Sequence, residues 1–250
     1  MPRYNPIGEP FIELSEVDSS NNYAMRQVQA QLAEHGTTWF AWHQTAGKGQ
    51  RGRTWEAEPG SNIILSSVVQ PPPDLFGNQF TLSMMVALSC YDFFSRHALN
   101  ETKIKWPNDI YWKDRKAGGI LIENVFKGAQ WRFSVIGIGI NINQTLFAEA
   151  LANPVSLKQI TGKTYNVIDL AKELCACLER RWKTLQTTSA AELLQEYCSH
   201  LYKNGQEVAF KKDAVKFHGK VEGVNLQGEL LLKNGKVNAF PFGTIEWVIA

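Results

Sequence analysis

The segment from Gln44 to Trp55 restricts the fold of this 250-residue chain more than any other. It reads Q-T-A-G-K-G-Q-R-G-R-T-W, with three glycines and three cations between Gly47 and Arg53. Glycine lets a backbone turn tightly and approach a ligand, and cations in such a loop favour a polyanion, most commonly phosphate. The alternative is a solvated basic turn, because runs of charge usually face water.

This basic loop, residues 44–55, partly matches two nucleotide-binding motifs. Its glycines fit G-x-G-x-x-G, and residues 47–54 come close to a P-loop with Arg53 in the place of lysine. Both motifs require a helix that begins at the loop. Here Pro59 and Gly60 follow, which disfavour a helix, and then comes the strand-like run I-I-L-S-S-V-V. We therefore expect the loop to join two strands, which excludes both motifs.

Charge and composition narrow the function classes. The chain has 26 basic and 24 acidic residues, a net charge of +2 that argues against general nucleic-acid binding but permits a local basic site. The N-terminus lacks an apolar signal core, and no run approaches the roughly 18 apolar residues of a membrane span. The cysteines at 90, 175, 177 and 198 lack zinc spacing and are expected to be free, mostly buried thiols. These features predict a cytoplasmic protein without a membrane segment.

The order of apolar runs predicts an α+β fold with two domains. Strands are expected at residues 11–14, 39–44, 62–69, 102–106, 109–112, 119–126 and 131–143. Helices are expected from the capping residues 18–22 to about 35, and at 80–97, 167–185 and 190–202. Residues 1–202 should form a mixed, largely antiparallel sheet with helices on one side. From Lys203 short strands alternate with glycine turns, which predicts a small SH3-like β-barrel over residues 203–250.

Two further segments combine cations with a turn or with glycines. Lys105 to Asp109 reads K-W-P-N-D, where the proline enforces an extended or turned backbone. Its Asn-Asp pair could simply satisfy local backbone groups. Lys116 stands just before Gly118 and Gly119 at the start of a buried strand. It is either solvated or within reach of a ligand that approaches the glycine backbone.

The strand that ends in G-I-G-I-N-I-N, residues 137–143, has two unlike faces. Strand alternation puts the isoleucines on one face and Gly137, Gly139, Asn141 and Asn143 on the other. Glycines inside a strand often mark the close approach of a ligand. A twisted edge strand is the alternative, and it explains two glycines on one face poorly.

Five segments taken in order resemble the catalytic domain of biotin protein ligases. They are D-S-S-N near residue 18, Q-T-A-G-K-G-x-R-G-R-x-W near 50, K-W-P-N-D near 105, R-K-A-G-G-I-L-I-E near 115 and G-I-G-I-N-I-N near 137. The C-terminal β module is similar to the tail of that family, so the resemblance covers nearly the whole chain. It implies a catalytic fold like that of class II aminoacyl-tRNA synthetases. It also implies activation of biotin by ATP to biotinyl-5′-AMP with release of pyrophosphate. Biotin would then pass to a lysine of a biotin carboxyl carrier protein, releasing AMP.

The resemblance also implies roles for the matching residues. Biotin would be bound by Ser19, Ser20, Asn21, Gln44, Lys48, Gly49, Gln50, Lys116, Gly118 and Gly119. ATP and the adenylate would be bound by Arg51, Arg53, Trp55, Lys116 and Asn141. The catalytic set would be Lys48, Arg51, Asp109 and Lys116, with Asp109 positioning the acceptor lysine or accepting its proton. Mg²⁺ would be held by the ATP phosphates, with Asn141 as a candidate ligand, and not by a dedicated cluster.

Two features depart from the usual pattern of the family. The commonest loop has arginine at the position of Gln50, where it helps to retain the adenylate, and we expect Arg51 to supply that charge here. The first matching block begins by residue 11, which leaves no room for the DNA-binding domain of some members, so no specific DNA binding is expected. Family members of this kind are monomers or sheet-edge dimers, and a monomer or weak homodimer is expected.

Two other functions stay open at this point. A lipoate or octanoate ligase or transferase is a fold relative with similar chemistry, although K-W-P-N-D and the loop followed by Trp55 favour biotin. A non-catalytic biotin sensor would bind biotin without releasing AMP, and the complete set of cations argues against it.

Overall fold

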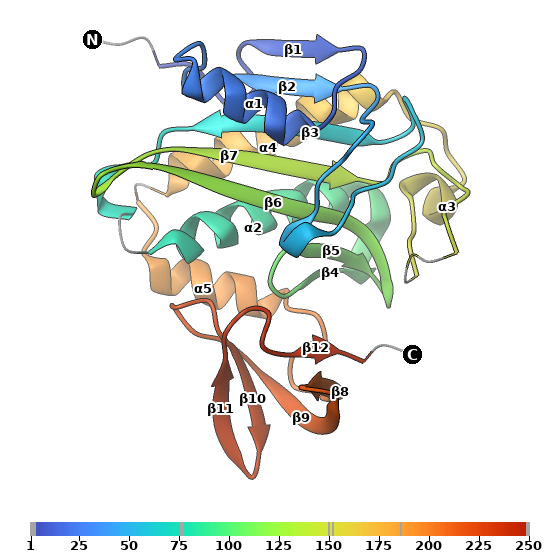
Figure 1. The fold of residues 1–250 in the computed structure, drawn as a ribbon. Helices are drawn as coiled ribbons and strands as arrows, with labels where there is room; N and C mark the ends of the chain where they lie inside the picture. The colour runs from blue at the N-terminus through green and yellow to red at the C-terminus, as the bar shows by residue number, and fades with distance from the viewer. Residues whose placement is uncertain (1–3, 76–77, 150, 152, 186, 249–250) are drawn as a thin grey trace.

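A seven-stranded sheet forms the larger part of the molecule (Figure 1). The computed structural model describes residues 4–75, 78–149, 151, 153–185 and 187–248. The strand order is β1-β2-β3-β7-β6-β5-β4, with β1 and β2 parallel and the other pairs antiparallel. The strands are β1 (Phe11–Leu14), β2 (Thr38–Ala41), β3 (Ile63–Val69), β4 (Thr102–Lys105), β5 (Asp109–Trp112), β6 (Arg115–Lys127) and β7 (Gln130–Ile140). The prediction of a mixed, largely antiparallel sheet is confirmed.

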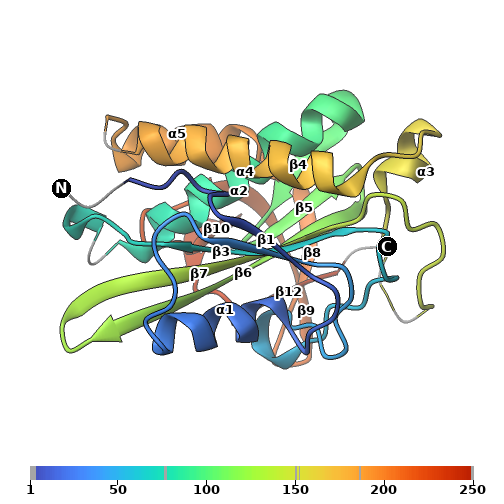
Figure 2. The same ribbon diagram turned by 90° about the horizontal axis from the view of Figure 1, so that it is seen from above.

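Helices cover both faces of this sheet. Helices α2 (Gln79–Ala98) and α4 (Val167–Thr184) lie on one face with α5 (Ala190–Ser199) against α2, whereas α1 (Ser20–Gln29) lies on the opposite face (Figure 2). The expectation of helices on one side is therefore wrong for α1. The physical reason lies in β3, which is buried along its whole length. Its Leu65 belongs to the core beneath α2, and its Val68 packs with Ala24 and Val28 of α1.

Several expected boundaries also differ from the structure: β2 ends at Ala41 and not at residue 44, β6 begins at Arg115 and not at residue 119, and α5 ends at Ser199 and not at residue 202. The first helix ends at Gln29 and not near residue 35, because Gln31 adopts a left-handed backbone with φ 59°. Leu32, which continues the four-residue spacing of Ala24 and Val28, is 72% exposed because it lies beyond the helix. Strand β7 ends at Ile140, so Asn141 follows the strand and is not part of it.

Helix α2 is the centre of the larger core. Its Leu82, Met85 and Phe93 are fully buried, and Cys90 beside them is a free thiol. The other three cysteines are also free, and two of them are buried, as predicted. Among the described helices, which include the short α3 (Leu157–Thr161), none is long and apolar enough to cross a membrane.

A second, five-stranded sheet follows α5. Its strands are β8 (Glu207–Lys212), β9 (Val215–Val224), β10 (Leu230–Asn234), β11 (Lys236–Phe240) and β12 (Glu246–Trp247). They pair antiparallel in the order β11-β10-β9-β8-β12. The β9–β10 turn contacts the first sheet, because the indole nitrogen of Trp106 donates a hydrogen bond to the carbonyl of Gly228 at 2.8 Å. The two sheets are thereby held in contact near the K-W-P-N-D segment.

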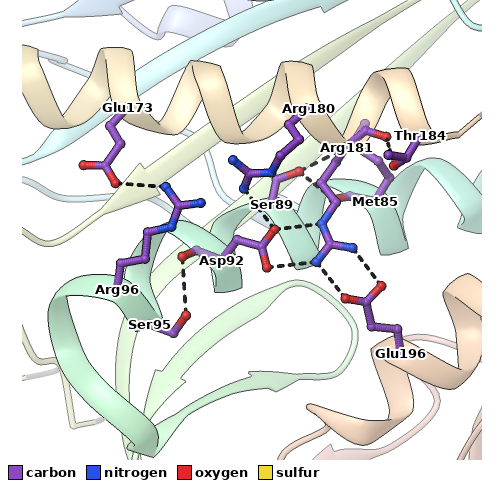
Figure 3. A network of polar contacts seen from close by, with 10 residues as sticks. All are labelled: Met85, Ser89, Asp92, Ser95, Arg96, Glu173, Arg180, Arg181, Thr184 and Glu196. Atoms are coloured by element: carbon purple, nitrogen blue, oxygen red, sulfur yellow. Dashed lines mark hydrogen bonds and ion pairs between the residues drawn. The ribbon is translucent and has the colours of Figure 1, made fainter.

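An ionic network joins the three helices on the α2 face (Figure 3). Arg181 of α4 donates to Asp92 of α2 at 2.8 Å and to Glu196 of α5 at 2.7 Å. The side chain of Arg181 is only 16% exposed, whereas that of Arg96, which pairs with Glu173, is 48% exposed. Charge-assisted hydrogen bonds gain strength when their groups are shielded from water.

Replacing Arg181 should therefore weaken the helical layer more than replacing Arg96. We expect Arg181→Ala to lower the free energy of unfolding by about 2 kcal/mol, because Glu196 loses its donor and Asp92 keeps only the longer contact to Arg180 at 3.3 Å. Arg96→Ala should cost less than about 1 kcal/mol, as exposed pairs do. Urea denaturation of both variants measures the difference. Equal losses would show that the network does not hold the helices together.

Candidate active site

A cavity of about 770 Å³ lies between the first sheet, the basic loop and the end of the second sheet. Its size is in the range of sites for small molecules and cofactors. It is lined by most of the residues that the sequence singled out: Ser19, Ser20, Asn21, Gln44, Lys48, Gly49, Gln50, Arg51, Arg53, Trp55, Asp109, Lys116, Gly119 and Asn141. Residues 242, 243 and 245 of the β11–β12 connection and residues 246–247 of β12 line it as well.

Gly118 is a predicted site residue that the structure does not bring to this cavity. It pairs with Ile110 and Ile140, and a methyl group added to it would lie 2.9 Å from the carbonyl oxygen of Gly139. Consecutive residues of a strand face opposite sides, so only Gly119 of this pair turns toward the cavity. Packing inside the sheet accounts for glycine at position 118.

The basic loop folds back on itself between β2 and β3. Lys48 and Thr54 form an isolated bridge, and the amide of Gly49 donates to the carbonyl of Arg53 at 2.7 Å. Its helical content is one 3-10 turn at Gln50–Gly52. Because no α-helix begins at the loop, it is neither a Rossmann nor a P-loop element, as predicted.

Strand β7 presents a bare backbone beneath this loop. A methyl group on Gly139 would overlap the indole ring of Trp55, and one on Gly137 would overlap the side chain of Asn21. Strand β7 lies between β3 and β6, so the edge-strand alternative is wrong. The glycines make room for two side chains that themselves line the cavity.

One end of the cavity is a fixed polar cluster at the start of α1. Ser20 donates its amide to the side-chain oxygen of Gln44 at 2.6 Å. The Ser66 hydroxyl contacts the Ser20 hydroxyl at 2.8 Å and the Asn21 oxygen at 2.6 Å. Asn21 in turn donates to Glu123 at 2.9 Å. Ser66 and Glu123 were missed as supporting residues, although Glu123 is the last residue of the R-K-A-G-G-I-L-I-E block.

The other end carries cations. The Lys116 ammonium pairs with Asp109 at 2.7 Å and lies 5.8 Å from the Trp55 ring centre. Lys105, which the sequence reasoning did not assign, donates to the hydroxyl of Tyr111 at 3.1 Å. Burial is the main reason that the pKa of Lys105 is lowered to about 8; the positive charges of Lys116 and Arg53 act in the same direction, and Asp109 opposes them. Lys105 could have been recognised as a site residue from the sequence, because it is the first residue of K-W-P-N-D.

Gln50 and Arg51 attach the basic loop to two different parts of the protein. The Gln50 amide donates to the carbonyl of Ile120 at 3.3 Å, where Asn108 also donates at 2.8 Å. The guanidinium of Arg51 donates to the carbonyl of Gly243 at 2.9 Å. The loop is therefore anchored to β6 through Gln50 and to the β11–β12 connection through Arg51.

Within the described residues, no group of three or more His, Cys, Asp or Glu side chains is arranged to hold an ion. The Asn141 amide nitrogen donates to the carbonyls of Lys116 and Val155, which fixes this side chain from within the chain. These residues fit a metal that arrives already bound to phosphate groups.

The model of the biotin/lipoate A/B protein ligase family matches residues 14–141, just over half of the chain. This chain belongs to that family. The bifunctional ligase/repressor BirA of Bacillus subtilis is 28% identical over 224 residues, which cover 88% of this chain and 69% of that protein. A biotin–[acetyl-CoA-carboxylase] ligase of Paracoccus denitrificans is 27% identical over 227 residues, covering 88% and 92%.

A solved structure of a biotin protein ligase has the same fold. The biotin protein ligase from Aquifex aeolicus in complex with biotin and ATP superposes with a TM-score of 0.80 at 25% identity. The superposition covers 96% of this chain and 99% of that one. The likeness includes the second sheet, because it extends over nearly the whole chain.

The contact between Gly139 and Trp55 can be tested on stability alone. We expect Gly139→Ala to cost about 2 kcal/mol of unfolding free energy, because its methyl group overlaps the indole ring. In a Trp55→Ala background the same change should cost less than about 0.5 kcal/mol. A double-mutant cycle by urea denaturation measures the coupling. Additive losses would contradict the contact.

Proposed function

We propose that this chain is an ATP-dependent biotin protein ligase. It activates biotin to biotinyl-5′-AMP with release of pyrophosphate, and then transfers biotin to a lysine of a biotin carboxyl carrier protein with release of AMP. The proposal depends on one observation, a single cavity with a fixed polar cluster at one end and cations at the other. Membership of the family and relatives that bear the name biotin ligase support it.

The polar end suits the biotin head group. The ureido ring both donates and accepts hydrogen bonds, which hydroxyl and amide groups can match. In this proposal Ser19, Ser20, Asn21 and Gln44 hold that ring. The buried hydrogen bonds of Ser20 and Asn21 support the assignment, because they orient both groups before a ligand arrives.

The cationic end suits the reaction of a carboxylate with a triphosphate. Two unit negative charges about 4 Å apart repel by roughly 4 kcal/mol at an effective dielectric constant near 20. A carboxylate oxygen of biotin bonds to the α-phosphorus while the bond to the bridging oxygen of pyrophosphate breaks. Lys116 exchanges Asp109 for the biotin carboxylate and the α-phosphate, where negative charge concentrates in the transition state. Mg²⁺ on the phosphates would add further positive charge.

The remaining assigned residues complete the two half-reactions. Lys48, Gly49 and Gln50 lie along biotin and the acyl phosphate, with Gly119 beneath them. Arg51, Arg53, Trp55 and Asn141 contact the adenylate. In the second step the acceptor amine attacks the acyl carbon, Asp109 accepts its proton and AMP leaves. The position of Asp109 beside Lys116 supports this role, because both groups line the same cavity.

We also propose that residues 1–202 form the catalytic domain and that residues 203–250 form an SH3-like β-barrel. The antiparallel order of five short strands supports the second assignment. A monomer or weak homodimer, a cytoplasmic location and the lack of specific DNA binding stay predictions.

Transfer of biotin to a carrier domain tests the proposed function. With ATP and Mg²⁺ the purified chain should biotinylate the carrier, detected with streptavidin. Lys116→Ala should slow the reaction about a hundredfold, as the loss of a charge-stabilising donor does. Lys127→Ala is the matched control, because Lys127 ends the same strand and is exposed outside the cavity. Absence of ATP-dependent labelling would refute the proposal.

The charge of Arg51 is a separate prediction. We propose that Arg51 takes the part of the arginine that the family usually has at position 50. Arg51→Ala should then reduce biotinyl-5′-AMP formation by about tenfold, the loss of one charge-assisted hydrogen bond. Gln50→Ala should be milder, because it removes a neutral contact to Ile120. A crippled Gln50→Ala beside a near-normal Arg51→Ala would reverse the assignment.

A further inference from the structure

Lys105 has surroundings unlike those of Lys116 in the same cavity. Its polar contact is the Tyr111 hydroxyl at 3.1 Å, whereas Lys116 is paired with a carboxylate at 2.7 Å. Its ammonium lies 4.8 Å from the ring centre of Tyr111 and 5.7 Å from that of Trp247. The ammonium is therefore held by a hydroxyl and by aromatic faces, which compensate its charge less than a carboxylate does.

The charges near Lys105 make it receptive to an anion. Burial, together with the neighbouring charges of Lys116 and Arg53, lowers its pKa to about 8, and Asp109 acts in the other direction. Tyr111 stays protonated because burial raises its pKa above the usual range. An arriving polyanion would offset both the burial and the repulsion between the cations.

A second donor beside Lys105 lacks an acceptor. The indole nitrogen of Trp247 is buried and has no hydrogen-bond partner among the described residues. Trp247 comes from β12 of the second sheet, far along the chain from Lys105, and both residues line the cavity. A buried N–H group without an acceptor is costly, so this end of the cavity favours a ligand rich in acceptor oxygens.

We propose that Lys105, Tyr111 and Trp247 form a subsite for the leaving pyrophosphate. This proposal rests on the proposed function, which supplies the anion. As the α-phosphorus gains the biotin oxygen and loses the bridging oxygen, the electron pair of the broken bond stays on pyrophosphate. The Lys105 ammonium donates a hydrogen bond to that charge and keeps its proton. Tyr111 and Trp247 donate to further phosphate oxygens.

The positive charge of Lys105 also argues against the acceptor lysine, the substrate of the second half-reaction, as its ligand. The acceptor lysine arrives largely as an ammonium ion, which Lys105 would repel and the Asp109 carboxylate would attract. Pyrophosphate carries several negative charges and matches three cations. The chemistry therefore assigns Lys105 to the leaving group and not to the incoming amine.

Calorimetric titration of the full chain with magnesium pyrophosphate tests the subsite. Lys105→Met should weaken pyrophosphate binding by about tenfold or more, the loss of a charge-assisted hydrogen bond. Lys105→Arg should stay within about threefold of wild type, because the charge is kept. Trp247→Phe, which removes the N–H group but keeps a ring, should weaken binding by about threefold to tenfold. Biotin affinity in each variant reports an intact fold.

Proton uptake gives a second readout that a merely structural lysine would not produce. Near pH 8 about half of the Lys105 side chains are neutral, so binding of the anion should draw protons from the buffer. Titrations in two buffers of different ionisation enthalpy measure this uptake. Lys105→Arg should remove the part due to Lys105, because arginine does not titrate there. The proton uptake of Lys105→Arg therefore tests the pyrophosphate subsite even if Lys105→Met does not fold.

The outcomes separate this proposal from the proposed function. If the chain forms biotinyl-5′-AMP but Lys105→Met binds pyrophosphate as wild type does, the subsite is wrong and the function stands. Unchanged proton uptake in Lys105→Arg also overturns the subsite. A variant that binds pyrophosphate normally but transfers biotin slowly would assign Lys105 to the acceptor step instead. A chain that neither binds biotin nor forms the adenylate would overturn the proposed function itself.

Discussion

The site is built on the close contact between the bare backbone of β7 and two side chains that lie on it, Asn21 and Trp55. Strand β7 is paired on both sides, by β3 and by β6, so this surface is rigid. Asn21 then positions the polar groups at the start of α1, and Trp55 places the basic loop beside Lys116. A side chain at position 137 would displace Asn21, and one at position 139 would displace Trp55. Either change would move the polar end of the cavity relative to the cationic end.

Repulsion among cations is the second constraint, and it explains why the cavity suits a polyanion. Lys116 and Arg53 are close enough to Lys105 to lower its pKa further after burial, and Asp109 acts in the other direction. Such a cluster is costly in the free protein and favourable when phosphate groups enter it. The second sheet takes part in this arrangement, because Arg51 is bound to Gly243 and the ring of Trp247 lies near the Lys105 ammonium. The second sheet therefore forms one wall of the cavity.

Sequence reasoning was reliable where local chemistry decides the structure. Pro59 and Gly60 exclude a helix after the basic loop, and the glycines of β7 indicate a close approach. It was unreliable where distant residues meet. Periodicity shows that α1 has an apolar face but not which side of the sheet that face covers. The meeting of Lys105 with Trp247 depends on packing between two sheets, which no local pattern encodes. Gly118 and Gly119 could not be told apart from the sequence, because neighbouring strand residues face opposite sides and only the packing shows that Gly119 is the one that lines the cavity.

The most direct measurement is the exchange of labelled pyrophosphate into ATP, catalysed by the purified chain without any carrier protein. This exchange runs the first half-reaction in both directions and requires both ends of the cavity at once. We predict exchange that depends on biotin and that lipoate does not support at the same concentration. Exchange without biotin, or equal exchange with lipoate, would contradict the account of the polar cluster as a biotin head-group site.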